Sequence, residues 1–185
     1  ITHPNIIKVY EYGETEDGLL FIVMEYVEGE TLHDYIKRCA PVKPARCLVI
    51  IEPLCEALDA AHRRNLLHRD LKPSNVLIGM SEGKETIKLA DFGIVKLLQP
   101  DDEISQGSSL TEAGEIFGTP SYMPPEQARG EIQALDERAD VYALGVILFE
   151  LITGLRPFVG STPEVMRQHI FAEPPYAQLP PGLPD

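Results

Sequence analysis

The chain has 185 residues, 44% hydrophobic and 24% charged, so we expect a single globular domain with a substantial core. Its net charge of −13 argues against nucleic-acid binding, because phosphate-binding surfaces are normally basic. The cysteines, Cys39, Cys47 and Cys55, match no zinc spacing, and their odd number argues against a disulfide framework. We therefore expect a reducing, cytoplasmic environment. No apolar run, including residues 141–152, is long enough to span a membrane.

The first predicted element is a strand pair. Residues 19–27 are apolar and β-branched between Gly18 and Gly29, which predicts a buried strand. Residues 6–12 are predicted to pair with it through a turn at Asp17-Gly18.

The pattern then becomes helical. Residues 31–39 predict a short helix, and residues 45–64 carry apolar side chains at spacings of three and four, which is typical of a longer one. Pro53 removes a backbone hydrogen bond inside this helix, so we expect a kink or a loosened turn there. Asn65 is suited to the left-handed conformation that ends a helix.

Short strands are predicted at residues 76–78 and 87–89, joined by a polar turn at residues 81–84. Residues 98–114 are rich in serine, aspartate and glycine, which predicts a mobile loop.

The last predicted elements are helical. Residues 140–153 are apolar nearly all round, which predicts a buried helix that ends at Gly154. Residues 161–164 begin another helix, and Pro174-Pro175 stops it.

Two motifs carry the chemistry. Residues 68–75 read HRDLKPSN, and residues 91–93 read DFG at the end of a predicted strand. Either motif alone is weak, but the two in this order on a loop–strand–loop frame are specific. The chain thus resembles the eukaryotic-type protein Ser/Thr kinase family, and its motif style is similar to bacterial members. The resemblance implies an α+β kinase fold, made mainly of the helical C-terminal lobe and the last strands of the N-terminal lobe.

The resemblance also implies catalytic roles. Phosphoryl transfer depends on positioning and charge neutralisation. Asp70 would orient the attacking hydroxyl and receive its proton, and Lys72 would place positive charge near the transferred group. Asn75 and Asp91 would supply oxygen ligands to Mg²⁺ or Mn²⁺ bound with ATP.

The adenine site is also implied by the resemblance. Met24 resembles the gatekeeper, and Glu25, Tyr26 and Val27 resemble the hinge whose backbone binds the base. Leu77 would pack beneath the base. The alternative is that these apolar residues are plain strand core.

Two further family positions concern the choice of substrate and the segment at residues 124–126. Thr119 resembles the threonine that contacts the catalytic aspartate and, with Lys72, favours Ser/Thr over Tyr substrates. Glu126 lies in Pro-Pro-Glu where the family has Ala-Pro-Glu, so Pro124 departs from the pattern. The usual arginine partner of Glu126 would lie beyond Asp185, which leaves Glu126 unpaired.

Four residues are expected to support the fold. His68 and Phe92 would pack in a column that links the lobes, together with Val9, and would take no part in acid–base chemistry. Asp140 resembles the family aspartate that accepts backbone hydrogen bonds from the HRD loop, and the alternative is an N-terminal helix cap.

Regulation is implied by Arg69, which marks kinases activated by phosphorylation of the activation loop. Thr111 is the preferred phosphosite, followed by Ser109. Ser108 and Ser105 are further candidates.

The expected organisation is one partial kinase domain over residues 1–185. Residues 1–24 would be a remnant of the N-terminal lobe, residues 25–30 the hinge and residues 31–185 an incomplete C-terminal lobe. The Gly-rich loop, the ATP-binding lysine and its glutamate partner would precede residues 3–5, so we expect this chain alone to be inactive.

A non-catalytic binding or regulatory module is the alternative function, although intact Asp70, Asn75 and Asp91 favour an active kinase. A small-molecule phosphotransferase would share the Asp/Asn loop but would not explain Gly-Thr-Pro at residues 118–120. The expected partners are ATP, protein substrates and a second kinase molecule for autophosphorylation. The parent protein could be membrane-anchored by a segment outside this chain.

Overall fold

The computed structural model describes residues 1–81, 83–92 and 120–183. Thr111, Ser109, Thr119 and the other candidates between residues 93 and 119 lie outside the described residues. In chain order the elements are β1 (Val9–Glu14), β2 (Leu20–Met24), β3 (Gly29–Thr31), α1 (Leu32–Cys39), α2 (Pro44–His62), β4 (Val76–Ser81), β5 (Lys84–Leu89), α4 (Pro125–Ala128), α5 (Glu137–Thr153) and α6 (Thr162–Phe171). Short 3₁₀ helices occupy Pro73–Asn75, Pro120–Tyr122, Ile132–Ala134 and Tyr176–Gln178.

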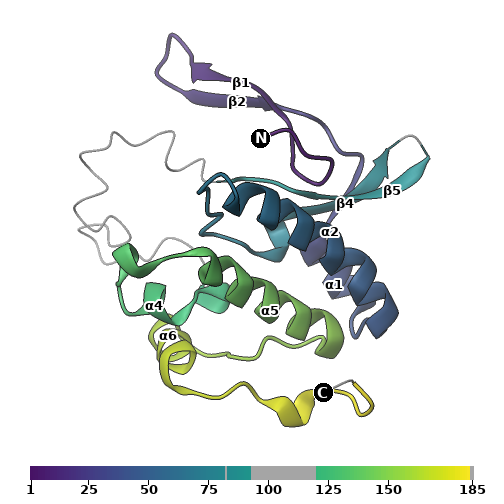
Figure 1. Ribbon diagram of the computed structural model, residues 1–185, viewed down its shortest axis with the longest axis vertical. Coiled ribbons are helices and arrows are strands. Elements are labelled where there is room, and N and C mark those ends of the chain that lie inside the picture. Colours follow the sequence, from purple (N-terminus) through teal and green to yellow (C-terminus); the bar gives the residue numbers. More distant parts are fainter. Residues whose placement is uncertain (82, 93–119, 184–185) are drawn as a thin grey trace.

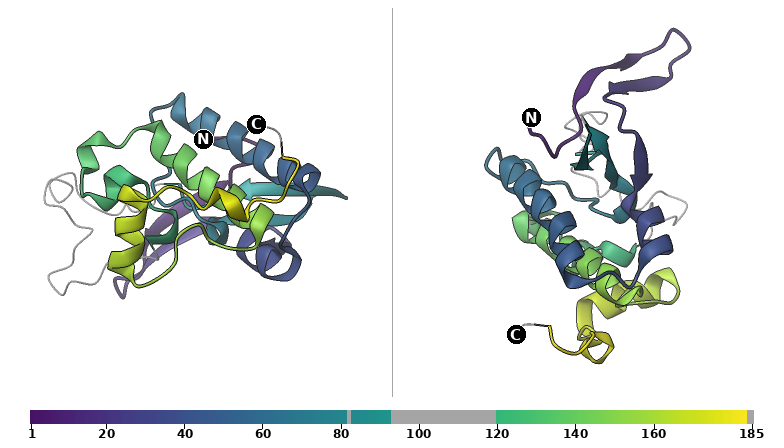
Figure 2. Two further views of the ribbon diagram at one scale, coloured as in Figure 1. Left: turned by 90° about the horizontal axis from the view of Figure 1, so that it is seen from below. Right: turned by 90° about the vertical axis from the view of Figure 1, so that its right-hand side faces the viewer.

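β1 and β2 form an antiparallel hairpin that stands apart from the helices (Figures 1 and 2). The predicted turn is present, with Gly18 at a φ of 81°. The prediction of a buried strand is wrong, because Leu20 is 56% and Val23 43% exposed. Side chains pointing to both faces of the hairpin are mostly exposed, so nothing in the described part of the chain covers either face. Val9 is 47% exposed and therefore does not join a buried column with His68 and Phe92.

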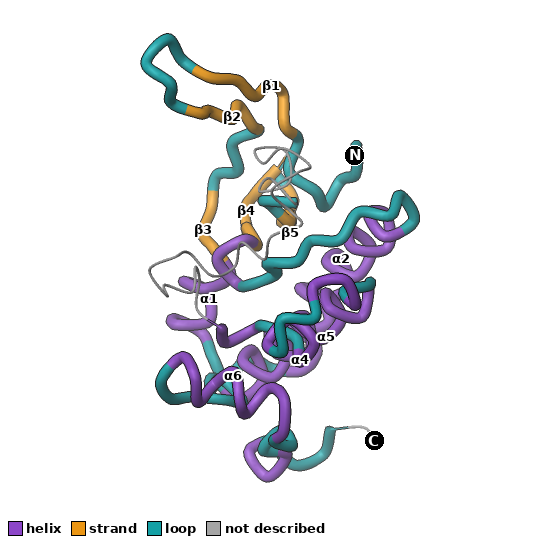
Figure 3. The backbone as a smooth tube through the Cα atoms, turned by 90° about the vertical axis from the view of Figure 1, so that its left-hand side faces the viewer, coloured by secondary structure: helices purple, strands orange, loops and turns teal. Residues whose placement is uncertain are grey.

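A second sheet, in the order β3-β4-β5, lies between the hairpin and the helices (Figure 3). β4 and β5 extend the predicted strands and pair from Val76↔Leu89 to Ser81↔Lys84. The N-terminal segment is fastened to β5 by hydrogen bonds from the Ile7 amide to the Leu89 carbonyl oxygen, 2.9 Å, and from Asn5 Nδ2 to the Ile87 carbonyl oxygen, 2.9 Å.

The helices begin and end with recognisable caps. Thr31 caps α1 by accepting a hydrogen bond from the Asp34 amide, and α6 has the capping box formed by Ser161 and Glu164. α2 is continuous through Pro53, and Asn65 has the expected left-handed φ of 55° beyond its end.

α5 starts three residues earlier than predicted, because Asp136 is its cap, and it ends at Gly154, φ 75°. The core lies where α2 and α5 pack against β4 and β5. Leu54, Leu89 and Ile147 are fully buried there. No helix in the described part of the chain is long and apolar enough to cross a membrane.

Candidate active site

The loop of residues 68–75 is held by one buried carboxylate. Asp140, 1% exposed on α5, accepts hydrogen bonds from the His68 amide at Oδ2, 2.9 Å, and from the Arg69 amide at Oδ1, 3.0 Å. His62 at the end of α2 also contacts Oδ2 through Nε2, 2.7 Å. A carboxylate that accepts several N–H groups is well compensated for its burial.

Asp140 therefore acts on the loop and not on its own helix. Asp136 provides the cap of α5 through the Arg138 amide, so the alternative reading of Asp140 as a simple cap is wrong. Arg69 has a φ of 66°, a conformation that costs a non-glycine residue energy and that the bond from its amide to Asp140 helps to maintain. His62 could not be found from sequence, because it lies 78 residues from Asp140 and belongs to no motif used here.

Asp70 and Lys72 project from this loop. The Asp70 side chain is 65% exposed, and its Oδ2 is 2.5 Å from Lys72 Nζ. Asn75 is buried, and its Nδ2 donates to the Asp70 carbonyl oxygen, 2.9 Å. The Asn75 amide thus fixes the backbone of Asp70 while the carboxylate stays accessible.

Asn75 and Asp91 lie beside one another at one end of the β4–β5 pair. Asn75 precedes β4, Asp91 follows β5, and the Ala90 amide donates to the Asn75 carbonyl oxygen, 2.8 Å. Asp91 has a left-handed φ of 62° and is exposed. The backbone thus brings two residues with oxygen-bearing side chains to the same end of the strand pair, and such groups suit Mg²⁺, which normally takes its remaining ligands from water and phosphate. Within the described ranges, no group of three His, Cys, Asp or Glu residues could hold a metal alone.

His68 is a structural residue, as expected. Its ring is buried against Phe92, with centroids 4.9 Å apart, and Nε2 contacts the Ala90 carbonyl oxygen at 2.9 Å. A carbonyl only accepts, so Nε2 carries the proton. Burial lowers the pKa of His68, which keeps the ring neutral near pH 7. This contact joins the HRD loop to the segment that carries Asp91.

The segment from Met24 to Val27 connects the hairpin to β3. The Glu25 amide donates to the Lys8 carbonyl oxygen, 2.9 Å, and the Glu25 carboxylate contacts Lys88 Nζ at 2.6 Å. Glu25 is therefore fixed by the protein itself, a contact that sequence reasoning missed. Met24 is 38% exposed at the end of β2.

Val27 passes tightly over β4. A Cβ atom on Gly79 would lie 2.5 Å from Val27 Cγ1, so only glycine fits there. Leu77 is half-buried on β4 and pairs with Thr31. It faces away from its buried neighbours Val76 and Ile78, because side chains alternate along a strand. Both residues thus lie at β4, Leu77 on the strand itself and Val27 in the connection before β3 that passes over it.

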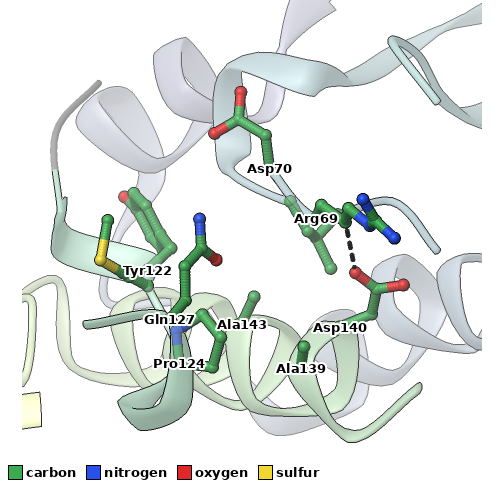
Figure 4. Close-up of a pocket in the computed structure, with 10 residues that line it drawn as sticks. Arg69, Asp70, Tyr122, Pro124, Gln127, Ala139, Asp140 and Ala143 are labelled. Atoms are coloured by element: carbon green, nitrogen blue, oxygen red, sulfur yellow. Dashed lines mark hydrogen bonds between the residues drawn. The ribbon is translucent and has the colours of Figure 1, made fainter. Parts of the chain in front are cut away.

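A small cleft of about 50 Å³, open in part to solvent, lies beside the loop (Figure 4). Arg69 and Asp70 line one side, and Tyr122 and Gln127 line another, above α5. Glu126 on α4 is half-buried, and its lack of an arginine partner stays a prediction.

Further contacts near the cleft have no sequence signal. Tyr122 Oη donates to Glu150 Oε2, 2.5 Å, and Arg156 Nη1 donates to Ser121 Oγ, 2.6 Å. These bonds fix the segment of residues 120–122 onto α5 and the turn after it.

Comparison with known proteins places the chain in one family. A family model for the protein kinase domain matches residues 1–179. The chain is 44% identical to serine/threonine-protein kinase pkn3 of Myxococcus xanthus, covering 95% of this chain and 31% of that protein. It is 41% identical to PknB of Mycolicibacterium smegmatis and to PrkC of Bacillus subtilis, covering 94% and 96% of this chain. These alignments span 27% and 26% of those two proteins.

Among solved structures, Rad53 (residues 1–466) in complex with AMP-PNP superposes with a TM-score of 0.68 at 28% identity. The match covers 91% of this chain and 39% of the Rad53 chain. Both kinds of comparison agree with the kinase fold expected from the HRD and DFG motifs.

Proposed function

Because this chain belongs to the protein kinase family, we propose that the protein containing it is a Ser/Thr protein kinase that transfers the γ-phosphoryl group of ATP to proteins. The observation that carries this proposal is the HRD loop bonded to buried Asp140, which holds Asp70 accessible while Asn75 and Asp91 lie side by side. A non-catalytic module has no need for these three groups together.

The proposed chemistry uses few residues. The substrate hydroxyl oxygen forms a bond to the γ-phosphorus, the bond to the β–γ bridging oxygen breaks, and ADP leaves. Asp70 orients the hydroxyl and receives its proton, and Lys72, 2.5 Å from Asp70, places positive charge beside the transferred group. Asn75 and Asp91 would hold a divalent ion, which when bound would supply neutralisation of the phosphate charge.

Nucleotide binding is proposed at the hinge. The carbonyl of Glu25 and the backbone of Val27 have no hydrogen-bond partner in the described part of the chain, so they are available to the edge of adenine. Met24 would limit the depth of the site and Leu77 would pack beneath the base. This assignment is supported by the close passage of Val27 over Gly79.

Substrate choice and regulation are also proposals. Thr119 would contact Asp70 and favour Ser/Thr substrates. Phosphate on Thr111 or Ser109 would pair with Arg69, whose side chain is exposed beside the cleft. A phosphate-free sequence at residues 105–111 in the active protein, measured by mass spectrometry, would exclude that mode of activation.

The function is tested with the natural protein that contains this sequence. It is incubated with γ-labelled ATP, a basic acceptor protein and either Mg²⁺ or Mn²⁺, and the labelled amino acids are identified. Labelled serine or threonine is expected, with loss of label in Asp91→Asn, while the matched exposed change Asp59→Asn retains it. Absence of label with both metals, or label on tyrosine alone, would contradict the proposal.

A further inference from the structure

A second hollow adjoins the cleft that contains Asp70. It has a volume of about 350 Å³, is open in part to solvent, and lies between α1, the 120–122 segment and the end of α5. Its lining includes His33, Lys37, Tyr122, Glu150 and Arg156. Tyr122 lines both hollows, so the two lie on either side of this residue.

The charge of this hollow differs from that of the chain as a whole. Lys37 and Arg156 are cationic, His33 is a third potential cation, and Glu150 is the one acidic residue of the lining. The whole chain has a net charge of −13, so a cationic hollow is unusual on this molecule. A local basic site in an acidic protein attracts anionic groups.

The cations of the hollow are not neutralised within the described residues. Neither Lys37 nor Arg156 forms an ion pair there, whereas Arg38 and Arg46 are paired with Glu30 and Glu85. Glu150 keeps its negative charge while its Oε2 accepts the hydrogen bond from Tyr122 Oη, 2.5 Å, so the lining holds two permanent cations against one carboxylate. Burial and Glu150 raise the pKa of Tyr122, so its hydroxyl remains a donor.

Arg156 is held in position and retains donors. Its Nη1 donates to Ser121 Oγ at 2.6 Å, which orients the guanidinium without neutralising its charge. A guanidinium has five N–H donors in a planar fork that matches a carboxylate. Lys37 on the facing helix α1 adds a mobile ammonium group.

We propose that this hollow binds an acidic side chain, Asp or Glu, of the protein substrate, a few residues from the serine or threonine that reaches Asp70. An extended peptide advances about 3.3 Å per residue, so a chain passing Tyr122 can fill both hollows. This inference rests on the proposed kinase function and adds a substrate class to it.

The test uses the natural protein and a peptide set with a fixed threonine and one Glu, Ala or Lys placed in turn at each of the flanking positions. At one or two positions Glu should lower KM about tenfold relative to Lys, the size expected of charge-assisted hydrogen bonds. Lys37→Glu and Arg156→Glu should each reverse this preference. The control Lys43→Glu makes the same charge change at an exposed site outside the hollow and should keep it.

A binding measurement tests this inference independently of the proposed kinase activity. The same peptides with alanine in place of threonine are titrated by fluorescence anisotropy, which needs no turnover. Glu-dependent binding that Lys37→Glu abolishes supports the hollow even if no phosphate is transferred. A peptide with phosphoserine in place of Glu should bind no more than about threefold tighter, whereas phosphoserine-only binding would overturn the assignment to carboxylates. Equal binding of Glu and Lys peptides at every position, or a preference that both variants leave intact, would also overturn it.

Discussion

The HRD loop and the β1–β2 hairpin are held in place by different kinds of interaction. The HRD loop is fixed by long-range hydrogen bonds to Asp140 and lies on a core in which α2 and α5 are closely packed. The β1–β2 hairpin has only its own ladder and a few bonds near Lys8, and its apolar side chains are largely exposed. The same kinds of residue, leucine and valine, therefore contribute packing energy in one region and almost none in the other.

This difference shows which interactions fix the geometry of the HRD loop. A buried carboxylate with three N–H partners allows one arrangement of the loop, because moving any donor leaves an unsatisfied polar group. An uncovered two-stranded hairpin is marginal alone, because it lacks a buried apolar face. The loop is thus positioned independently of the hairpin, whereas the hinge depends on contacts such as Glu25 with Lys88.

The largest effect is expected for Asp140→Ala. Three donors would lose their acceptor, so the free energy of unfolding should fall by ~3–5 kcal/mol, as measured by chemical denaturation. In the natural protein, kcat should fall at least about 100-fold because the loop moves. The matched change Asp136→Ala removes the α5 cap and an exposed ion pair with Arg138, so it should destabilise the chain much less and leave kcat unchanged. Equal effects of the two variants would refute the anchoring role of Asp140.

Two leucine-to-alanine variants, one in the core and one on the hairpin, test this comparison of the two regions directly. Leu54→Ala, in the core, should lower the free energy of unfolding of the 185-residue chain by ~2–5 kcal/mol. Leu20→Ala, on the hairpin, should change it by less than about 0.5 kcal/mol because the side chain is already exposed. Similar losses would show that the hairpin is packed in solution.

The next effect is a pH dependence from buried histidines. Burial lowers the pKa values of His68 and His169, so the folded chain binds fewer protons than the unfolded chain, whose histidines titrate near 6.5. Stability is therefore full above about pH 6.5 and is lost as the pH falls below it. The variant His169→Gln removes one buried histidine, so the slope of the free energy of unfolding against pH should fall by up to about 1.4 kcal/mol per pH unit.

Denaturation at several pH values between 7.5 and 5 measures this slope. The Tyr142 hydroxyl, 2.6 Å from His169 Nδ1, loses a partner in this variant, so absolute stability will also fall. That loss lowers the free energy of unfolding at every pH and leaves its slope against pH unchanged. A slope identical to that of the parent chain would mean that His169 is protonated equally in both states.

The smallest effect is expected at the ion pair that fastens α2 to β5. Glu85 accepts from Arg46, with Nη2 to Oε2 at 2.7 Å, and this contact lowers the pKa of Glu85. Both side chains are partly exposed, so Glu85→Gln should cost only about 0.5 kcal/mol near pH 7. The difference in stability between the variant and the parent chain should vanish as the pH falls through the carboxylate range, because Glu85 is then protonated and uncharged in the parent chain too. A persistent difference at pH 3 would assign the effect to packing.

Much of the active-site loop was predictable because its chemistry is local in sequence. HRDLKPSN places Asp70, Lys72 and Asn75 within six residues, and DFG adds Asp91. Helix signals such as Ser161 with Glu164 and the Gly154 cap were likewise local and are confirmed. The exposure of β2 was not predictable, because an apolar strand has the same pattern whether or not another element covers it.

The contacts missed by sequence reasoning are long-range and between common residue types. His62 with Asp140, Glu25 with Lys88, and Tyr122 with Glu150 join residues 28 to 78 positions apart. Nothing in a single sequence distinguishes such a histidine or glutamate from a solvated one. The start of α5 was misplaced for a related reason, since Asp136 and Asp140 are both plausible caps and only the fold shows which one faces the loop.

The most direct test of the account is Asp70→Asn in the natural protein, measured as kcat and as KM for ATP. The change keeps the size of the side chain but removes the proton acceptor that the Asn75 amide and the Asp140 anchor hold in place. The account predicts that kcat falls about 10²–10⁴-fold while KM for ATP changes less than about threefold. A variant that keeps at least half of the parent kcat would contradict the assignment of Asp70 as the catalytic base.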